Sequence, residues 1–281
     1  MTDIDFLAIG HVAKDVTPGG WRIGGAVAHA AVQAQRLGLR TAVVTRAGSD
    51  IDVAKELPGV EVRQVDSEET TTFENHYESG RRTQHVWAQA GPLGAEHVPG
   101  EWRQARIVLL GPVLGEVPIG IGRLFSRSLL VFSPQGWLRE VRTNGLVRRR
   151  PWRRSVSLKG CRVLVASEED IEGDERALRS WTRDVPIVVI TDGARGARVH
   201  VEGGWRRIGA FVRREIDPTG AGDVFAAAFV VRLEETGDVA EAARFASAAG
   251  SLCVAGEGIG AIGSREQIEK VLARHPEVAL E

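Results

Sequence analysis

Residues 217–223 read Asp-Pro-Thr-Gly-Ala-Gly-Asp and run directly into the apolar stretch 224–231. A glycine-containing turn followed at once by such a stretch predicts a tight turn that opens a buried helix. Gly220 and Gly222 lack a Cβ atom, so the turn can adopt positive φ values and bring backbone N–H groups close to an anion. The unpaired N–H groups and the dipole of the following helix favour negative charge at the same place. The sequence therefore predicts a phosphate cradle with the carboxylate of Asp223 at its mouth.

A turn of this kind can also be purely structural, because Asp and Thr are common helix N-caps and glycine is common in turns. Aspartates at both ends and Thr219 before the first glycine favour the anion site. Residues 217–225, DPTGAGDVF, resemble the C-terminal signature of the PfkB, or ribokinase-like, family of carbohydrate kinases without a gap or a substitution. The resemblance implies an ATP-dependent kinase with a ribokinase-like three-layer α/β/α sandwich, a mostly parallel central sheet and a small β lid.

The resemblance also assigns roles within this signature. In the family the last aspartate is the general base that takes the proton from the substrate hydroxyl, which implies that role for Asp223. The amides of the Gly-Ala-Gly stretch form the anion hole for the transferred phosphoryl group, which implies Gly220, Ala221 and Gly222, with Thr219 beside the donor phosphates. Phosphoryl transfer needs mainly positioning, charge stabilisation and one group that accepts the nucleophile's proton, so these residue types suit the chemistry.

Two further segments resemble the donor site of the family. Residues 191–196 follow a predicted strand and resemble its Thr-x-Gly-x-x-Gly turn beside the nucleotide, which implies that Thr191, Gly193 and Gly196 bind ATP. Residues 167–170, Ser-Glu-Glu-Asp, lie where the family has an Asn-x-x-Glu motif that organises magnesium and phosphate, which implies Mg²⁺ at Glu168 and Asp170. Clustered carboxylates suit this hard cation, but acidic residues at a helix start also complement the helix dipole.

The N-terminal part of the chain holds the expected substrate contacts. Gly24 and Gly25, followed by His29, are similar to a second family signature, a glycine pair before an asparagine that contacts the sugar. His29 departs from that pattern, and a histidine on an apolar helix can also be a core residue. Asp15 follows the first predicted strand, where the family has an aspartate that binds sugar hydroxyls. A carboxylate suits this role as a double acceptor, although a turn or cap aspartate is the alternative.

Residues 133–139, Ser-Pro-Gln-Gly-Trp-Leu-Arg, follow another predicted strand. From this position the side chains of Gln135 and Arg139 can reach substrate or phosphate. The segment is similar to one in myo-inositol-kinase-like members of the family, which favours a cyclic polyol as the substrate.

The rhythm of strands and helices predicts a parallel sheet built from βαβ units. We expect two lid segments, at about 11–22 and 70–91, the second a hairpin around Ser79-Gly80. Helices are expected at 26–37 and 265–274, and as a pair joined at Gly237-Asp238. The expected strands of the main sheet are 5–10, 41–45, 106–110, 129–132, 162–166 and 186–191.

Composition limits the classes of partner. The chain has 281 residues, enough for one kinase domain over 1–281, and its formal net charge of −1 favours neither nucleic acid nor a membrane surface. The arginine-rich run 148–154 could bind an anion, but such a run is more often a solvated loop. Cys161 and Cys253 read as reduced core residues, and no apolar stretch reaches the length of a membrane span. These features predict a cytoplasmic protein.

The predicted activity is transfer of the γ-phosphoryl group of ATP to a hydroxyl of a small sugar or polyol, with myo-inositol favoured. A nucleoside kinase of the same family is one alternative. A sugar- or nucleotide-sensing protein without catalysis is another, suggested by His29 and Ser167. Phe73, Tyr77, Val86 and Trp87 in the lid would also permit a homodimer through the lid.

Overall fold

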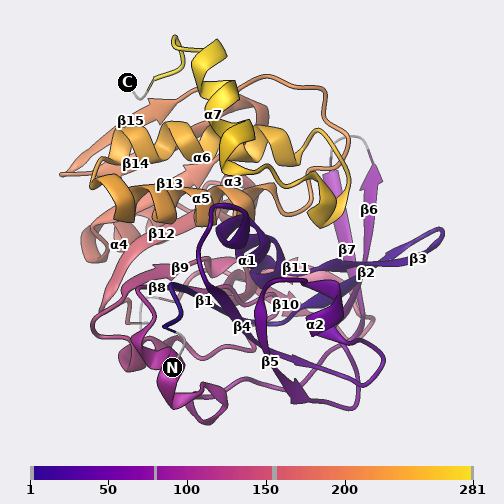
Figure 1. The fold of residues 1–281 in the computed structure, drawn as a ribbon. Helices are drawn as coiled ribbons and strands as arrows, with labels where there is room; N and C mark the ends of the chain where they lie inside the picture. Colours follow the sequence, from indigo (N-terminus) through magenta and orange to yellow (C-terminus); the bar gives the residue numbers. More distant parts are fainter. Residues whose placement is uncertain (1–2, 79–80, 154–156, 280–281) are drawn as a thin grey trace.

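The computed structural model describes residues 3–78, 81–153 and 157–279, and a nine-stranded sheet runs through its centre (Figure 1). The sheet order is β15-β14-β13-β12-β9-β8-β1-β4-β5. The parallel strands are β1 (Phe6–Ile9), β4 (Thr41–Ala47), β5 (Glu61–Asp66), β8 (Ile107–Leu110), β9 (Leu129–Phe132), β12 (Cys161–Ser167) and β13 (Ile187–Thr191). At one edge, β14 (Ala197–Val201) and β15 (Gly204–Ile208) are antiparallel. The mostly parallel sheet is therefore confirmed.

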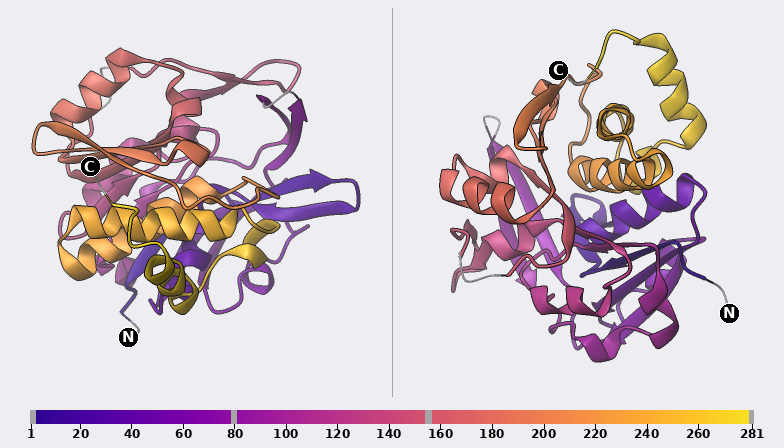
Figure 2. Two further views of the ribbon diagram at one scale, coloured as in Figure 1. Left: turned by 90° about the horizontal axis from the view of Figure 1, so that it is seen from above. Right: turned by 90° about the vertical axis from the view of Figure 1, so that its left-hand side faces the viewer.

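Both faces of the sheet are covered, because side chains of a strand alternate between its faces. Within β1, Phe6 and Ala8 enter one apolar core, whereas Leu7 and Ile9 enter the other. The first core packs under α1 (Ala26–Arg36), α2 (Val53–Glu56), α5 (Ala221–Thr236), α6 (Val239–Cys253) and α7 (Arg265–Arg274). The second packs under α3 (Glu168–Ile171), α4 (Glu175–Asp184) and single-turn segments such as Gly100–Gln104 and Ile119–Leu124. Figure 2 shows α5, α6 and α7 gathered on one side of the sheet.

A second sheet of four strands, which we call the lid, stands beside the carboxyl edge of the main sheet (Figure 1). Its order is β3-β2-β6-β7, formed by β2 (Ala13–Thr17), β3 (Gly20–Gly24), β6 (Thr72–Glu78) and β7 (Arg81–Ala88). These strands fall within or close to the two expected segments, while the expected turn Ser79-Gly80 lies outside the described residues. A hairpin of β10 (Arg139–Val141) and β11 (Val147–Arg149) was not expected. It joins the lid through the Val86 amide, which donates to the Gly145 carbonyl at 2.9 Å.

Buried hydrogen bonds fix the base of the lid to the main sheet. His11, directly after β1, is fully buried; its Nδ1 meets the Thr71 hydroxyl at 2.8 Å and its Nε2 meets the Gly91 carbonyl at 2.9 Å. A carbonyl only accepts, so Nε2 carries the proton and Nδ1 accepts from Thr71. Burial lowers the pKa of His11, although Glu116 and the Gly91 carbonyl act in the opposite direction. The neutral ring therefore links the end of β1 to the segments that precede β6 and follow β7.

Asp50 makes a second link of this kind. Its carboxylate accepts hydrogen bonds from the Thr70 hydroxyl and from the Lys14 ammonium group, while Thr70 accepts from the Gly48 amide at 3.0 Å. Lys14 belongs to β2 and Thr70 precedes β6. The Gly-x-Asp turn after β4 thus holds two lid strands in place.

The lid carries both buried and exposed apolar side chains. Phe73 and Val86 pack beneath the lid against Ala26 and Val113, so these two are not available to an exposed dimer surface. Trp87 is 65% exposed, and the side chain of Tyr77 lies outside the described part of the structure.

Cys161 and Cys253 are buried and unpaired, as expected. Across the three described ranges, we find no helix with the length and apolar character needed to span a membrane.

Part of the arginine-rich run 148–154 has a structural use. Arg149 donates to the backbone carbonyl of Asp170 at 2.9 Å and pairs with Asp174 at 3.0 Å. Arg150 donates to the Trp137 carbonyl at 2.9 Å. These two arginines therefore connect β11 and the residue after it to neighbouring segments of the chain. Arg154 lies outside the described residues.

Candidate active site

A cavity of about 440 Å³ lies between the lid and the carboxyl edge of the main sheet. Segments that follow β9, β12 and β13 line it, together with the starts of α1 and α5 and the inner face of the lid. This is the edge at which open α/β sheets bind ligands. The predicted site residues that line it are Asp15, Gly25, His29, Gln135, Arg139, Asp170, Thr191, Gly193, Gly196, Thr219, Gly220, Ala221, Gly222 and Asp223.

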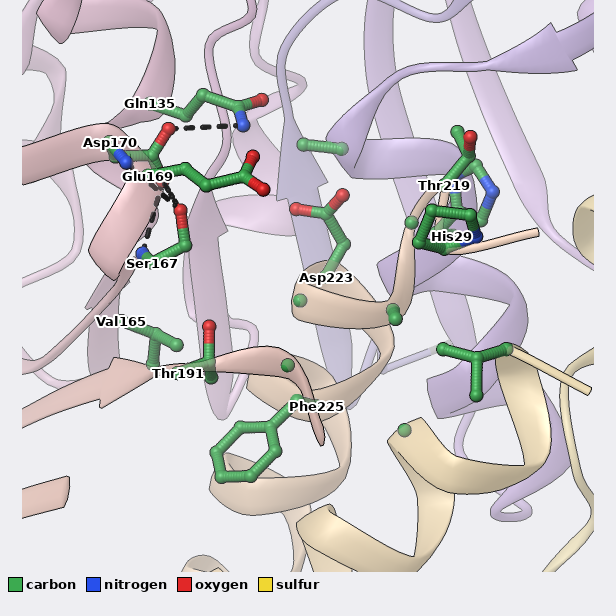
Figure 3. A pocket seen from close by; sticks show the side chains of 18 of the residues that line it. His29, Gln135, Val165, Ser167, Glu169, Asp170, Thr191, Thr219, Asp223 and Phe225 are labelled. Carbon is green, nitrogen blue, oxygen red and sulfur yellow. Dashed lines mark hydrogen bonds between the residues drawn. The ribbon is translucent and has the colours of Figure 1, made fainter. Parts of the chain in front are cut away.

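The signature turn forms as the sequence suggests. Asp217 Oδ1 accepts from the Thr219 amide at 2.9 Å, and Gly220 takes the left-handed conformation with φ of 78° as the N-cap of α5. Asp223 is consequently in the first turn of α5, and its carboxylate points into the cavity (Figure 3). The Ala221 amide donates to the Pro218 carbonyl at 3.2 Å. Of the expected anion-hole amides, that of Ala221 is therefore engaged in closing the turn.

His29 packs directly against this turn. A Cβ atom on Gly220 would lie 2.0 Å from His29 Cδ2, so only glycine fits beside the ring. His29 Nδ1 lies 3.1 Å from the Gly25 carbonyl, and Nε2 is buried with no hydrogen-bond partner among the described residues. The substrate signature and the anion-hole signature are thus in van der Waals contact.

The acidic side chains that follow β12 point in different directions. Asp170 accepts from the Ser167 amide at 3.1 Å and the Ser167 hydroxyl at 2.8 Å, and Gln135 Nε2 donates to its other oxygen at 3.2 Å. Figure 3 places the Glu169 carboxylate in the cavity, facing that of Asp223. Glu168 pairs with Arg198 at 2.8 Å and lines a separate small recess.

The placement of Glu168 corrects one expectation for the metal. Glu168 is held by Arg198 in the separate recess, whereas Glu169 and Asp170 both line the cavity. The cavity carboxylates of this segment are therefore Glu169 and Asp170. The described ranges contain no group of three or more His, Cys, Asp or Glu side chains arranged to hold a metal ion. Two carboxylates beside bound phosphates nevertheless suit Mg²⁺, which keeps several waters and takes few protein ligands.

Gly24 does not line the cavity. A Cβ atom there would lie 2.1 Å from Asp15 Oδ2, so this glycine makes room for the Asp15 carboxylate on the neighbouring strand. Asn75 and Gln84, which the sequence analysis did not single out, do line the cavity from β6 and β7. Their alternation with outward-facing residues in the predicted hairpin was the available signal.

The other end of the cavity is lined by residues that follow β13, by the segment before the signature turn and by α6. Ala194, Arg213 and Ser251 are among them, and Arg213 Nε donates to Ser251 Oγ at 3.4 Å. Thr191, at the end of β13, and Phe225, in α5, also line the cavity (Figure 3). We call this region the donor end, and the region of Asp15 and His29 the acceptor end.

Comparison with known proteins agrees with this geometry. The sequence model of the pfkB family carbohydrate kinases matches residues 162–265, which include the carboxylates after β12 and the signature turn. The chain therefore contains, at residues 162–265, a segment that matches the pfkB family carbohydrate kinases. It is accordingly a phosphotransferase with a hydroxyl group as acceptor, of the ribokinase-like class that acts on sugars and nucleosides.

Individual relatives differ in donor and acceptor. A cytidine kinase of Thermococcus kodakarensis is 27% identical over 254 residues, 81% of this chain and 87% of that protein. A pyrophosphate-dependent kinase of the ribokinase family, solved with a pyrophosphate analog and myo-inositol, is 27% identical with a TM-score of 0.78, covering 94% of this chain and 99% of that one. An Arabidopsis thaliana ribokinase solved with ribose and ATP has a TM-score of 0.74 at 22% identity, covering 96% and 99%, and so supports the fold.

Proposed function

We propose that residues 1–281 form one kinase domain that transfers the γ-phosphoryl group of ATP to a hydroxyl of a small sugar or polyol, with Asp223 as general base. The observation that carries this proposal is the position of the Asp223 carboxylate, between the acceptor end and the Gly220–Gly222 turn of a single cavity. A general base needs to lie within hydrogen-bond reach of the proton that it takes. The proposed acceptor and donor sites meet at this point.

In the proposed mechanism, Asp223 accepts the proton of the attacking hydroxyl as its oxygen forms a bond to the γ-phosphorus. The bond between the γ-phosphorus and the bridging oxygen breaks, and the electron pair leaves with ADP. The Gly220 and Gly222 amides and the N-terminal end of α5 stabilise the negative charge on the equatorial oxygens. Thr191, Gly193 and Gly196 would position the donor on the opposite side of this turn.

Glu169 and Asp170 are the residues that would hold Mg²⁺ beside the donor phosphates. The Glu169 carboxylate faces that of Asp223 (Figure 3), and Ser167 and Gln135 orient the Asp170 carboxylate through the hydrogen bonds described above. When bound, the cation neutralises charge on the donor phosphates. Asp170→Asn is expected to raise the Mg²⁺ concentration needed for half-maximal turnover.

The decisive experiment measures phosphorylated product with ATP and Mg²⁺ against myo-inositol, ribose, fructose and cytidine. Asp223→Asn should lower kcat by about 10²–10⁴-fold, the usual contribution of a general base. A matched control is Asp238→Asn at the N-cap of α6, where asparagine caps equally well and the cavity is not involved. Unchanged turnover in Asp223→Asn with every accepted substrate would refute the role of this residue. Binding without any product would instead favour the sensor.

Pyrophosphate is a second candidate donor. The similarity to a pyrophosphate-dependent kinase supports it, and Arg213 supplies a guanidinium group at the donor end. The test compares ATP with pyrophosphate as donor for the best acceptor, in the wild type and in Arg213→Met. A pyrophosphate-specific loss of kcat/KM in the variant would favour pyrophosphate. Higher kcat/KM with ATP than with pyrophosphate, with no effect of the variant, would reject it.

A nucleoside acceptor is the remaining alternative, supported by the similarity to a cytidine kinase. Cytidine differs from ribofuranose by a cytosine base in place of the anomeric hydroxyl, so a comparison of the kcat/KM values for cytidine and ribose separates the two classes. A preference for cytidine would move the assignment to nucleosides without changing the proposed role of Asp223.

A further inference from the structure

The ring of His29 is enclosed by the protein, although the residue borders the cavity. His29 is only 1% exposed. Its Nδ1 lies 3.1 Å from the Gly25 carbonyl, and because a carbonyl only accepts, the proton of the neutral ring is on Nδ1. Nε2 is buried and has no hydrogen-bond partner among the described residues. A substrate hydroxyl could therefore reach Nε2 only if the ring left its present position.

The same ring forms a wall of the signature turn. A Cβ atom on Gly220 would overlap Cγ, Cδ2 and Nε2 of His29, so the ring lies directly against the backbone of Gly220 (Figure 3). Gly220 has the left-handed conformation and is the N-cap of α5. The first amides of a helix lack partners within the helix, and here they include the proposed anion hole. The ring thus packs against the residue whose conformation decides where these amides point.

Other contacts hold the start of the turn but leave Gly220 to the ring. The Asp217 amide donates to the Val254 carbonyl, at the end of α6, at 3.3 Å. The Asp217 carboxylate in turn accepts from the Thr219 amide at 2.9 Å. Neither of these two hydrogen bonds involves Gly220. A glycine has no Cβ atom to limit its φ and ψ angles, so the neighbouring ring of His29 is what restricts this position.

The helix that carries the ring is itself anchored. Gln33, one turn after His29 in α1, is fully buried and donates from Nε2 to the Gly263 carbonyl at 3.3 Å. Arg36, near the end of the same helix, donates to the Ile262 carbonyl. Both carbonyls belong to the segment that follows α6, the helix to which the signature turn is also bound. The ring therefore has a rigid support from which to hold the turn.

We infer that His29 is a positioning residue, whose bulk holds Gly220 in the left-handed conformation and so aims the anion-hole amides at the transferred phosphoryl group. This inference rests on the proposed kinase function and goes beyond it, because it moves His29 from substrate recognition to the anion hole. Stabilisation by preorganised amides depends on their exact placement. A displacement of about 1 Å can cost about 10²-fold in rate.

The test compares loss of the ring's bulk with loss of its nitrogens. His29→Asn is smaller but polar, whereas His29→Leu nearly conserves the volume and removes both nitrogens. We expect His29→Asn to lower kcat by about 10²-fold while KM for the best acceptor stays unchanged. His29→Leu should recover most of that loss. Gln35→Asn is the matched control, because Gln35 is half-buried on the same helix and lies outside the cavity lining.

Equilibrium binding gives a readout that does not depend on turnover. The probe is pyrophosphate with Mg²⁺, titrated calorimetrically into the full chain without an acceptor. His29→Asn should bind it about tenfold more weakly than the wild type, the size of one hydrogen bond to a charged group. His29→Leu and Gln35→Asn should both bind it within about threefold of the wild type. Binding of the best acceptor, measured in the same way, should be equal in all four proteins and shows that each variant is folded.

The outcomes separate this inference from the proposed function. A raised acceptor KM in His29→Leu, with His29→Asn equal to the wild type, would overturn the inference and return His29 to substrate recognition. Wild-type pyrophosphate affinity in His29→Asn, or no pyrophosphate binding by the wild type, would also overturn it. The kinase assignment would survive these results if Asp223-dependent turnover were measured. Pyrophosphate binding that follows the bulk at position 29, without transfer to any acceptor, would support the positioning role and refute the proposed function.

Discussion

Gly220→Ala tests whether the contact between His29 and the signature turn is as tight as the structure indicates. The new Cβ would lie 2.0 Å from His29 Cδ2, and Gly220 has a φ of 78°. The left-handed conformation costs an alanine about 1–2 kcal/mol. Overpacking against the buried ring adds about 1–3 kcal/mol. The variant should therefore lose roughly 2–5 kcal/mol of unfolding free energy.

Gly237→Ala is the matched control for the backbone contribution. Gly237 ends α5 with a φ of 70°, and a Cβ atom there would meet nothing within 4 Å. It should show the conformational cost alone, so Gly220→Ala is expected to be less stable than Gly237→Ala by about 1–3 kcal/mol. Urea unfolding measures both, with an unchanged m-value showing that the comparison is valid.

The decisive step is the same substitution in a His29→Ala background. Removing the ring removes the clash, so Gly220→Ala should then cost about as much as Gly237→Ala. The double-mutant cycle would give a coupling free energy of about 1–3 kcal/mol between positions 29 and 220. If Gly220→Ala costs the same with and without His29, the ring does not restrict the turn and the reasoning is refuted.

Further predictions concern titration and thiol chemistry. Because burial lowers the pKa of His11, the unfolded chain binds a proton at this imidazole more tightly than the folded chain does. The contribution of His11 to the free energy of unfolding should therefore be complete above about pH 6.5 and should decline as the pH falls below that value. Urea unfolding between pH 5 and 8 should show this slope in the wild type and a reduced one in His11→Gln, and equal slopes would contradict it. Burial, with Asp217 and Asp223 nearby, raises the pKa of the Cys253 thiol to about 12, and burial also raises that of Cys161. Neither thiol should react with a thiol reagent at pH 8 until urea unfolds the protein.

The sequence predicted the elements whose signals are local. The apolar stretch after Gly220 and the cap at Gly237 bound α5 closely to where it is found, and α7 begins and ends at the predicted residues. The N-terminal glycine pair likewise opens α1. The β10–β11 hairpin was missed because its strands are only three residues long and depend on pairing with each other and with β7. Short pairings between distant segments leave little periodicity to detect.

The sequence predicted the site residues whose position follows from a backbone motif. It was less informative where the direction of a side chain decides whether the residue lines the cavity. The signature turn placed Asp223 in the cavity, since its position in the first turn of α5 follows from the glycines. Glu168 and Glu169 are chemically equivalent in the sequence, and only the start of α3 and the partner Arg198 decide which faces the cavity. Gln84 is likewise ordinary in sequence. It lines the cavity because β7 pairs with β6, and it donates to Asn75, which in turn donates to Asp15 on another strand.

The contacts of the lid differ in strength between its base and its free side. At the base, the His11 and Thr71 side chains are buried and hydrogen-bonded, and an unmade bond there would leave polar groups unsatisfied. On the free side, Arg22 of β3 pairs with Glu257 at 3.0 Å and lies 3.6 Å from Asp217, with side-chain exposures of 44% for Arg22 and 68% for Glu257. Exposed pairs of this kind contribute about 0–1 kcal/mol. If the lid opens, the Arg22 contacts should therefore break while the base holds. Asp217 also accepts from the Thr219 amide, so in this structure Arg22 places a positive charge beside the turn that we propose as the anion cradle.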